Sequence, residues 1–347
     1  LVGFGVKDSI MTIGDRQYNS LHIYQVKMTL ADADTDDEKQ EVYYKHAADG
    51  QKEYYKWLNE MYNEGILDPE FATQTHEDFV LKVAEGRVLG LLDEEWDYTG
   101  AEISLRADGQ EEHTYAGLPV TIDRSVKCPS LKQQNLAVGW GIGITKSCKD
   151  PVRAVRFLDW LCSDEAQILL NWGIEGVDYY YDENGKRCIT EEDLEASRKD
   201  TNYSERTGVG FRVYPYPSYG NQSVDSTGNS YSKSSREMVK EGYDEMEKEA
   251  LKAWNVDMLT DIFPQKEEFS KDAYSPLWAL TLPDELEKML VALDNVSWKG
   301  LIECVVSPAD DFDAKWDELQ QNLKDAGLEK ADREMTALLR DEISRRE

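Results

Sequence analysis

The stretch that most constrains the fold of this chain runs from residue 137 to residue 173. An apolar run at residues 138–144 is typical of a short strand. Asp150 and Pro151 then predict the start of a helix at 151–162, with the carboxylate as N-cap and proline in the first helical position. Its apolar residues recur at helical spacing and form one face: Val152, Val155, Leu158 and Leu161.

A second helix follows at once. Ser163 is its expected N-cap, acidic residues occupy its first turn, and Gly173 ends it after residues 164–172. The whole stretch therefore predicts a strand–helix–helix unit, and nothing in it points to catalysis.

Elsewhere the sequence predicts more helices than strands. Hydrophobic spacing indicates helices at 43–64, ended by Gly65, and at 79–85, and a strand at 87–92 that leads to Trp96. Further helices are predicted at 237–254, at 283–294 and, broken at Gly327, within 313–346.

The order of these elements resembles the segment of extracellular solute-binding proteins, family 1, that re-enters the first lobe after the hinge. In that family a strand of the form G-x-x-I-x-K-x-x-K precedes helices of the form A-x-x-F-L-x-x-L-x-S-x-E-x-Q. The matching residues here are Gly141, Ile144, Lys146, Lys149, Ala154, Phe157, Leu158, Leu161, Ser163, Glu165 and Gln167.

Other stretches extend the resemblance in the family's order. Residues 53–70 resemble its helix and turn L-x-x-L-Y-x-E-G-L-I-D-P-E, and residues 78–96 resemble its helix and strand F-x-x-G-K-x-A-M-x-x-x-x-W. Residues 115–120 stand where the family has a strand ending in Leu-Pro, and residues 280–330 resemble the C-terminal helices of its long members. Motifs in this order, spread over most of the chain, favour the family assignment.

The resemblance implies an α/β fold of the class II periplasmic-binding-protein type, helix-rich, with two lobes of which one is incomplete. It places the first part of lobe two at 1–135, the re-entrant part of lobe one at 136–205 and the mainly helical C-terminal part of lobe two at 206–347. The chain begins at Leu1 as if in the middle of a domain. We therefore expect a C-terminal fragment of a protein whose N-terminal lipid anchor lies upstream.

The charge of the chain limits its partners. It carries 69 acidic and 39 basic residues, which give a formal net charge of −30. Such a surface repels phosphate backbones and anionic lipid head groups, so we expect no nucleic-acid partner. No run of the sequence approaches the roughly 20 consecutive apolar residues of a membrane span.

The cysteines and histidines form no pattern typical of a site. The five cysteines match no zinc spacing and no compact disulfide framework: Cys128, Cys148, Cys162, Cys188 and Cys304. The four histidines, His22, His46, His76 and His113, are isolated in the sequence. We therefore predict no metal site and no cofactor.

Trp96 is the first candidate for a ligand-binding residue. It lies just beyond the end of a predicted strand, next to Glu95 and Asp97. A flat indole stacks on the apolar face of a sugar ring, while neighbouring carboxylates accept hydrogen bonds from its hydroxyl groups. The resemblance also places a ligand-stacking aromatic residue at this position. The alternative is a tryptophan that packs the strand against a helix.

Four other aromatic residues are candidates for the same ligand. Trp140, between two glycines, fits a cleft wall or an interlobe core position equally well. Trp172 ends a predicted helix, where a packing anchor is the commoner role. Tyr214 and Tyr216 lie in a proline-rich loop that could present them to a ligand or cover a core edge. By contrast, Trp57, Trp160 and Trp316 lie on apolar helical faces and are predicted to be in the core.

The function implied by the resemblance is capture, not catalysis. A carbohydrate, expected to be an oligosaccharide, would lie between two lobes that close on it, and the closed protein would dock on the transmembrane subunits of an ABC permease. This implies a location outside the cytoplasm at the cell surface and a monomer when full length. The alternatives are a glycoside hydrolase or a binding module for another ligand. Hydrolysis needs carboxylates on both sides of the scissile bond, whereas residues 93–97 are adjacent in sequence.

Overall fold

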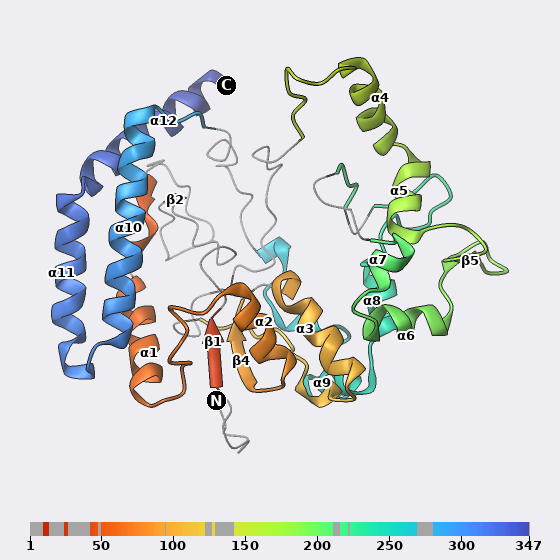
Figure 1. Cartoon of the computed structure of the whole chain (residues 1–347), viewed down its shortest axis with the longest axis horizontal. Helices are drawn as coiled ribbons and strands as arrows, with labels where there is room; N and C mark the ends of the chain where they lie inside the picture. The colour runs from red at the N-terminus through yellow and green to blue at the C-terminus, as the bar shows by residue number, and fades with distance from the viewer. Residues whose placement is uncertain are drawn as a thin grey trace. The chain divides into compact units, whose positions relative to one another are not determined.

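The computed structural model of the chain describes residues 10–13, 24–26, 42–47, 50–93, 95–121, 127–128, 142–210, 216–220, 223–268 and 280–346. The chain divides into two compact units (Figure 1). Unit 1 comprises Leu1–Tyr98, Leu118–Val138 and Phe263–Glu347, and unit 2 comprises Thr99–Gly117 and Gly139–Ile262. The lobe boundaries predicted from the sequence, at 1–135, 136–205 and 206–347, stay a prediction, because these units are not assigned to lobes.

Unit 1 contains two short strand pairs. They are β1 (Ile10–Ile13) with β4 (Val88–Leu92), in parallel, and β2 (Tyr24–Val26) with β3 (Val42–Tyr44), antiparallel. β4 confirms the strand predicted at 87–92. The helix before it, α2 (His76–Ala84), begins earlier than predicted because Thr75 and Asp78 form a capping box.

A group of helices forms the core of unit 1. These helices are α1 (Gln51–Asn63), α10 (Asp284–Val306), α11 (Phe312–Asp325) and α12 (Leu328–Arg346). Figure 1 shows α10 between α1 and α11. Their buried side chains include Tyr55, Leu58, Leu286, Leu290, Leu293, Leu301, Phe312, Leu319 and Leu323. Trp316 is buried as predicted, and the predicted break at Gly327, where φ is +104°, separates α11 from α12.

Asn59 ties α1 to the C-terminal end of α10. Its side chain is fully buried, and Nδ2 lies 3.0 Å from the carbonyl oxygen of Cys304 and 2.7 Å from that of Ser307. The last carbonyl groups of a helix lack partners within the helix, so this amide satisfies groups that would otherwise be buried without hydrogen bonds.

Side chains of α12 form hydrogen bonds with backbone N–H groups of β3. Thr336 Oγ1 accepts a hydrogen bond from the Val42 N–H at 2.9 Å, and Asp332 Oδ1 accepts one from the Tyr44 N–H at 2.9 Å. The prediction that 43–64 is one helix is therefore wrong at its start. Residues 42–44 are a strand, because β2 and α12 supply hydrogen-bond partners that lie far away in the sequence.

Burial of the Asp332 carboxyl has a consequence for stability. Burial raises its pKa to about 6 from the ordinary 3.8, and the hydrogen bond from Tyr44 offsets only part of this rise. The folded protein therefore favours the protonated form more than the unfolded chain does. As the pH rises from about 4 to about 6, Asp332 progressively lowers the free energy of unfolding.

Asp332→Asn is expected to raise the free energy of unfolding at about pH 7 by on the order of 1–3 kcal/mol. The amide keeps an acceptor for the Tyr44 N–H and removes the buried charge. Urea unfolding of both proteins across the pH range measures the effect, which should fade near about pH 4. Asp341→Asn, at an exposed carboxylate of the same helix, is the control. If the free energies of unfolding of Asp332→Asn and the wild type differed equally at every pH, a raised pKa of Asp332 would be contradicted.

Unit 2 is mainly helical. Its elements include α3 (Glu95–Ala107), which begins in unit 1, α4 (Pro151–Leu161), α5 (Asp164–Trp172), α6 (Glu191–Lys199), α7 (Tyr203–Thr207), α8 (Arg236–Gly242) and α9 (Glu245–Trp254), with the hairpin β5 (Tyr180–Tyr181) and β6 (Arg187–Cys188). The helix predicted at 237–254 is two helices, α8 and α9, because Asp244 and Glu247 form a capping box that starts α9.

The two helices predicted after residue 150 are confirmed. The side chain of Asp150 accepts a hydrogen bond from the Arg153 N–H at the start of α4. Ser163 caps α5 in the same way, and Gly173 ends it with a φ of +87°.

The expected strand before α4 is not found in the part of 138–144 that is described. Residues 142–144 form no strand, and residues 138–141 lie outside the described residues. A strand exists only when a neighbour pairs with it, and among the described residues no strand pairs with this segment.

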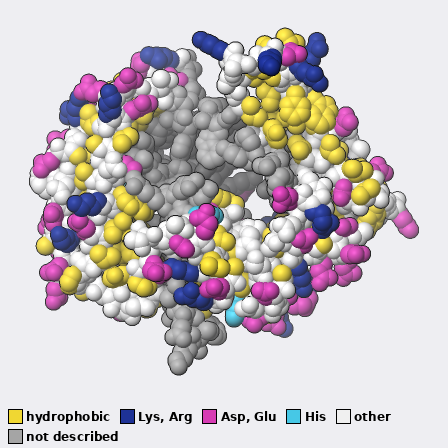
Figure 2. Space-filling view, viewed as in Figure 1, with side chains coloured by type: hydrophobic (Ala, Val, Ile, Leu, Met, Phe, Trp, Pro, Cys, Tyr) yellow, Lys and Arg dark blue, Asp and Glu magenta, His cyan; other side chains and the backbone are white. Residues whose placement is uncertain are grey.

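The apolar face predicted for α4 is only partly buried. Leu161 is buried, but Val152 and Val155 are exposed. The prediction that Trp160 is in the core is also wrong. Its side chain is 37% exposed and stacks on Phe157 instead, with ring centroids 6.0 Å apart. Exposed apolar side chains of this helix form a yellow patch in Figure 2.

No helix among the described residues has both the length and the apolar character needed to cross a membrane.

Candidate functional site

The candidate site lies at the connection between β4 and α3. β4 is an apolar strand that ends at Leu92, and α3 begins at Glu95. Trp96 and Asp97 therefore lie in the first turn of a helix, within unit 1. In this turn the backbone N–H groups have no partners within the helix, so other contacts must fix its orientation.

Neighbouring residues of this turn have opposite environments. Trp96 is 60% exposed, and Glu95 is exposed beside it. Asp97 and Tyr98 are buried. Successive helical side chains point in directions about 100° apart, so the indole faces solvent while the next two side chains face the interior.

The carboxylate of Asp97 faces a histidine. Nδ1 of His76, the first residue of α2, lies 3.6 Å from Oδ1 of Asp97. The Asp97 side chain is 2% exposed and that of His76 is 30% exposed. Sequence reasoning missed this pair, because it joins two helix starts that only the fold brings together.

Carboxylates and an indole in one turn define what this site can do. The exposed Trp96 offers a flat apolar surface, and Glu95 offers hydrogen-bond acceptors next to it. Such a surface can bind a ring that has an apolar face and hydroxyl groups at its edge. The carboxylates at 93, 95 and 97 come from one short segment, so they do not by themselves provide two groups on opposite sides of a bond.

Trp172, in unit 2, is fully buried. Its Nε1 donates to the carbonyl oxygens of Ser230 and Tyr231, both at 3.1 Å. The guanidinium of Arg187 lies 5.3 Å from the indole centroid. This environment favours the packing interpretation of Trp172, and its role in ligand binding stays a prediction.

Arg187 is the centre of the cluster that encloses Trp172. It is buried, and its guanidinium lies over Tyr179 and Tyr181 as well as over the indole. Its charge is balanced by Asp225, at 2.5 Å. Burial alone would raise the pKa of Asp225, but hydrogen bonds from Thr227 and Arg187 outweigh burial and lower it. The guanidinium Nη atoms of Arg187 are thus hydrogen-bonded, whereas its buried Nε has no hydrogen-bond partner among the described residues. The cluster is a packed polar network rather than an open site.

The remaining candidates divide between described and undescribed residues. Tyr216 is half-buried and meets the ring of Phe157 edge to face, with centroids 6.3 Å apart. Trp140 and Tyr214 lie outside the described residues. The roles of all three in ligand binding stay predictions.

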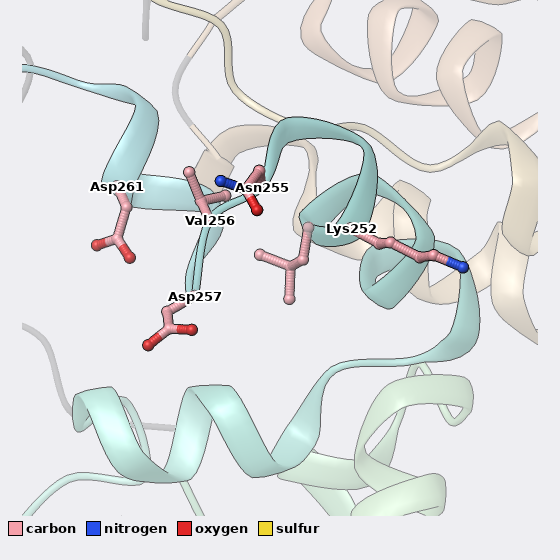
Figure 3. Close-up of a pocket in the computed structure, with 6 residues that line it drawn as sticks. Lys252, Asn255, Val256, Asp257 and Asp261 are labelled. Atoms are coloured by element: carbon pink, nitrogen blue, oxygen red, sulfur yellow. The ribbon is translucent and has the colours of Figure 1, made fainter.

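A hollow of about 500 Å³ lies at the C-terminal end of α9 in unit 2 (Figure 3). It is lined by Leu251, Lys252, Asn255, Val256, Asp257 and Asp261. Asp257 pairs with Lys240 at 3.3 Å and Asp261 pairs with Arg236 at 2.9 Å. The lining holds no aromatic side chain, so it lacks the stacking surface that Trp96 provides. Among the described residues, no group of three or more His, Cys, Asp or Glu could hold a metal ion.

Comparison with known proteins finds a family likeness over just under half of the chain. Residues 7–172 match the family described as bacterial extracellular solute-binding protein. This match confirms the resemblance read from the sequence motifs, and it includes Trp96 and its neighbours. No curated protein gave a match.

Two solved structures resemble the chain. The alginate-binding protein AlgQ2 without calcium ion has 15% identity over 95% of this chain and 64% of that chain, with a TM-score of 0.49. An HMO-binding, ABC-transporter-associated solute-binding protein from Bifidobacterium longum infantis has 13% identity over 97% of this chain and 66% of that chain, with a TM-score of 0.50. The chain thus spans just under two thirds of the length of each. The second likeness confirms the helix-rich, periplasmic-binding-protein-like α/β fold.

Proposed function

We propose that this chain, a bacterial extracellular solute-binding protein by the match of its residues 7–172, is the substrate-binding component of an ABC importer and captures an oligosaccharide. The observation that carries the proposal is the exposed indole of Trp96 beside carboxylates, inside the segment that matches the family.

The chemistry of the Trp96 site supports a carbohydrate ligand. A sugar ring has an apolar C–H face that an indole covers well and a rim of hydroxyl groups that carboxylates can bind. Binding sites for small molecules commonly combine an aromatic wall with a few polar groups. The similar protein from Bifidobacterium is itself an HMO-binding protein, which agrees with this proposal.

Capture would work by closure of two lobes. A ligand shifts the protein toward the closed state when it makes contacts with both lobes only in that state. The closed protein would then dock on the transmembrane subunits of the permease. We further propose that the protein acts as a monomer at the outer cell surface, held there by an N-terminal lipid.

Trp96→Ala is expected to weaken oligosaccharide binding roughly 5- to 150-fold, which corresponds to the loss of one stacking aromatic side chain. Titration calorimetry on the wild type and the variant measures the change. The unfolding temperature should stay nearly the same, because the side chain is mostly exposed. Trp160→Ala, also at an exposed tryptophan, is the matched control and should bind as the wild type does. Unchanged affinity in Trp96→Ala would show that Trp96 does not bind the ligand and would favour a packing role.

A further inference from the structure

We infer that His76 and Asp97 are a positioning pair that holds the first turn of α3, and with it the indole of Trp96, in the orientation that binds ligand. This inference rests on the proposed function of the Trp96 site. It also changes the role expected for Asp97, from a direct ligand contact to a support behind the site.

The burial of Asp97 is the first observation. Its side chain is 2% exposed, so the carboxylate is turned away from solvent, whereas the neighbouring Trp96 is 60% exposed. A carboxylate in this environment is costly unless a charged or hydrogen-bonding group faces it. Nδ1 of His76 lies 3.6 Å from Oδ1 of Asp97, within ion-pair distance.

The rigidity of the partner is the second observation. His76 is the first residue of α2 and lies between the two residues of the capping box, Thr75 and Asp78. In this box the Asp78 N–H donates to Thr75 Oγ1 at 3.1 Å. Phe79, one turn further on, is fully buried, and its ring lies 6.4 Å from that of His76. Both ends of the first turn of α2 are thus fixed, so His76 offers a fixed point to which Asp97 can attach.

The pair acts on the first turn of α3. A first turn depends on contacts outside its own helix for its orientation, because its N–H groups lack partners within the helix. Asp97 follows Trp96 directly, so a contact that fixes Asp97 also fixes the direction in which the indole points. Stacking on a sugar ring requires a defined indole plane, so loss of the support should weaken binding without any loss of a ligand contact.

The first experiment measures oligosaccharide affinity in His76→Ala, Asp97→Asn and the double variant. His76→Ala is expected to weaken binding about 3- to 30-fold, and the double variant should be no worse than the weaker single variant. His76→Asn, which keeps a polar side chain facing the carboxylate, should recover most of the affinity. Glu77→Ala, at the exposed next residue, is the matched control and should leave affinity unchanged.

The second experiment needs no ligand, so it separates this inference from the proposed function. Fluorine NMR of the fluorotryptophan-labelled protein resolves its nine tryptophans, and Trp96→Phe identifies the Trp96 signal. His76→Ala is expected to shift or broaden that signal and to leave the others in place. A changed signal in a protein that binds no oligosaccharide would support the pair and overturn the proposed function. An unchanged signal, or additive losses of affinity in the double variant, would overturn the pair.

Discussion

Lys82→Met is expected to lower the free energy of unfolding by about 3–5 kcal/mol, the cost of leaving a buried carboxylate without its partner. Lys82, on α2, is buried, and its Nζ lies 2.8 Å from Oδ2 of Asp68 and 2.9 Å from a carboxylate oxygen of Glu70. Burial alone would lower the pKa of Lys82, but the hydrogen bonds to Asp68 and Glu70 outweigh it and raise this pKa. The lysine therefore stays charged and anchors the turn between α1 and α2.

Chemical denaturation monitored by circular dichroism measures the effect of Lys82→Met. Lys315→Met is the matched control, because Lys315 is also on a helix of unit 1 and is paired to a carboxylate, Glu318, but its side chain is 40% exposed. The free energy of unfolding of Lys315→Met should lie within about 1 kcal/mol of the wild-type value. Adding Asp68→Asn to Lys82→Met should restore part of the stability, since it removes the buried negative charge that Lys82 balanced. Equal losses for the two lysine variants would show that burial of this ion pair contributes little.

Gly173→Ala is expected to cost about 2–5 kcal/mol of unfolding free energy, from backbone strain and a steric clash together. Gly173 ends α5 with φ +87° and ψ −140°, a conformation that is open to glycine and poor for other residues. A Cβ at this position would lie 2.3 Å from Oδ2 of Asp178, whose carboxylate accepts a hydrogen bond from the Ile174 N–H. The Asp178 side chain cannot move away from the new Cβ without breaking its hydrogen bond to the Ile174 N–H.

Gly176→Ala separates the two causes in Gly173→Ala. Gly176 also has a positive φ, of +75°, but a Cβ there would have nothing within 4 Å. Gly176→Ala should lose only the unfolding free energy that corresponds to backbone strain, about 1–2 kcal/mol. Asp178→Ala in the Gly173→Ala background should relieve the clash, so the two changes together should cost less than their sum. A Gly173→Ala protein as stable as Gly176→Ala would exclude the clash.

Features encoded by neighbouring residues could be predicted from the sequence. α4 and α5 were predicted almost to the residue, because Asp150, Ser163 and Gly173 are caps that act on their own helices. The break at Gly327, with φ +104°, follows from the same local chemistry. The family assignment also came from short motifs.

Features set by distant partners could not be predicted. β3 looks like the start of a helix in sequence. Its strand form depends on pairing with β2 and on hydrogen bonds to Thr336 and Asp332, nearly 300 residues away. The candidate site shows the same division. The sequence identified Trp96 by its position after a strand, but the pairing of Asp97 with His76 depends on where two helix starts meet. His76 looked isolated because only the fold gives it a partner.

Native mass spectrometry of the protein with a panel of neutral oligosaccharides tests the central claim, capture of a carbohydrate without chemical change, most directly. At least one oligosaccharide is expected to form a one-to-one complex, to be released with its mass unchanged after denaturation, and to bind more weakly to Trp96→Ala. Shortened sugar products, or a complex that forms equally well without the indole of Trp96, would contradict the central claim.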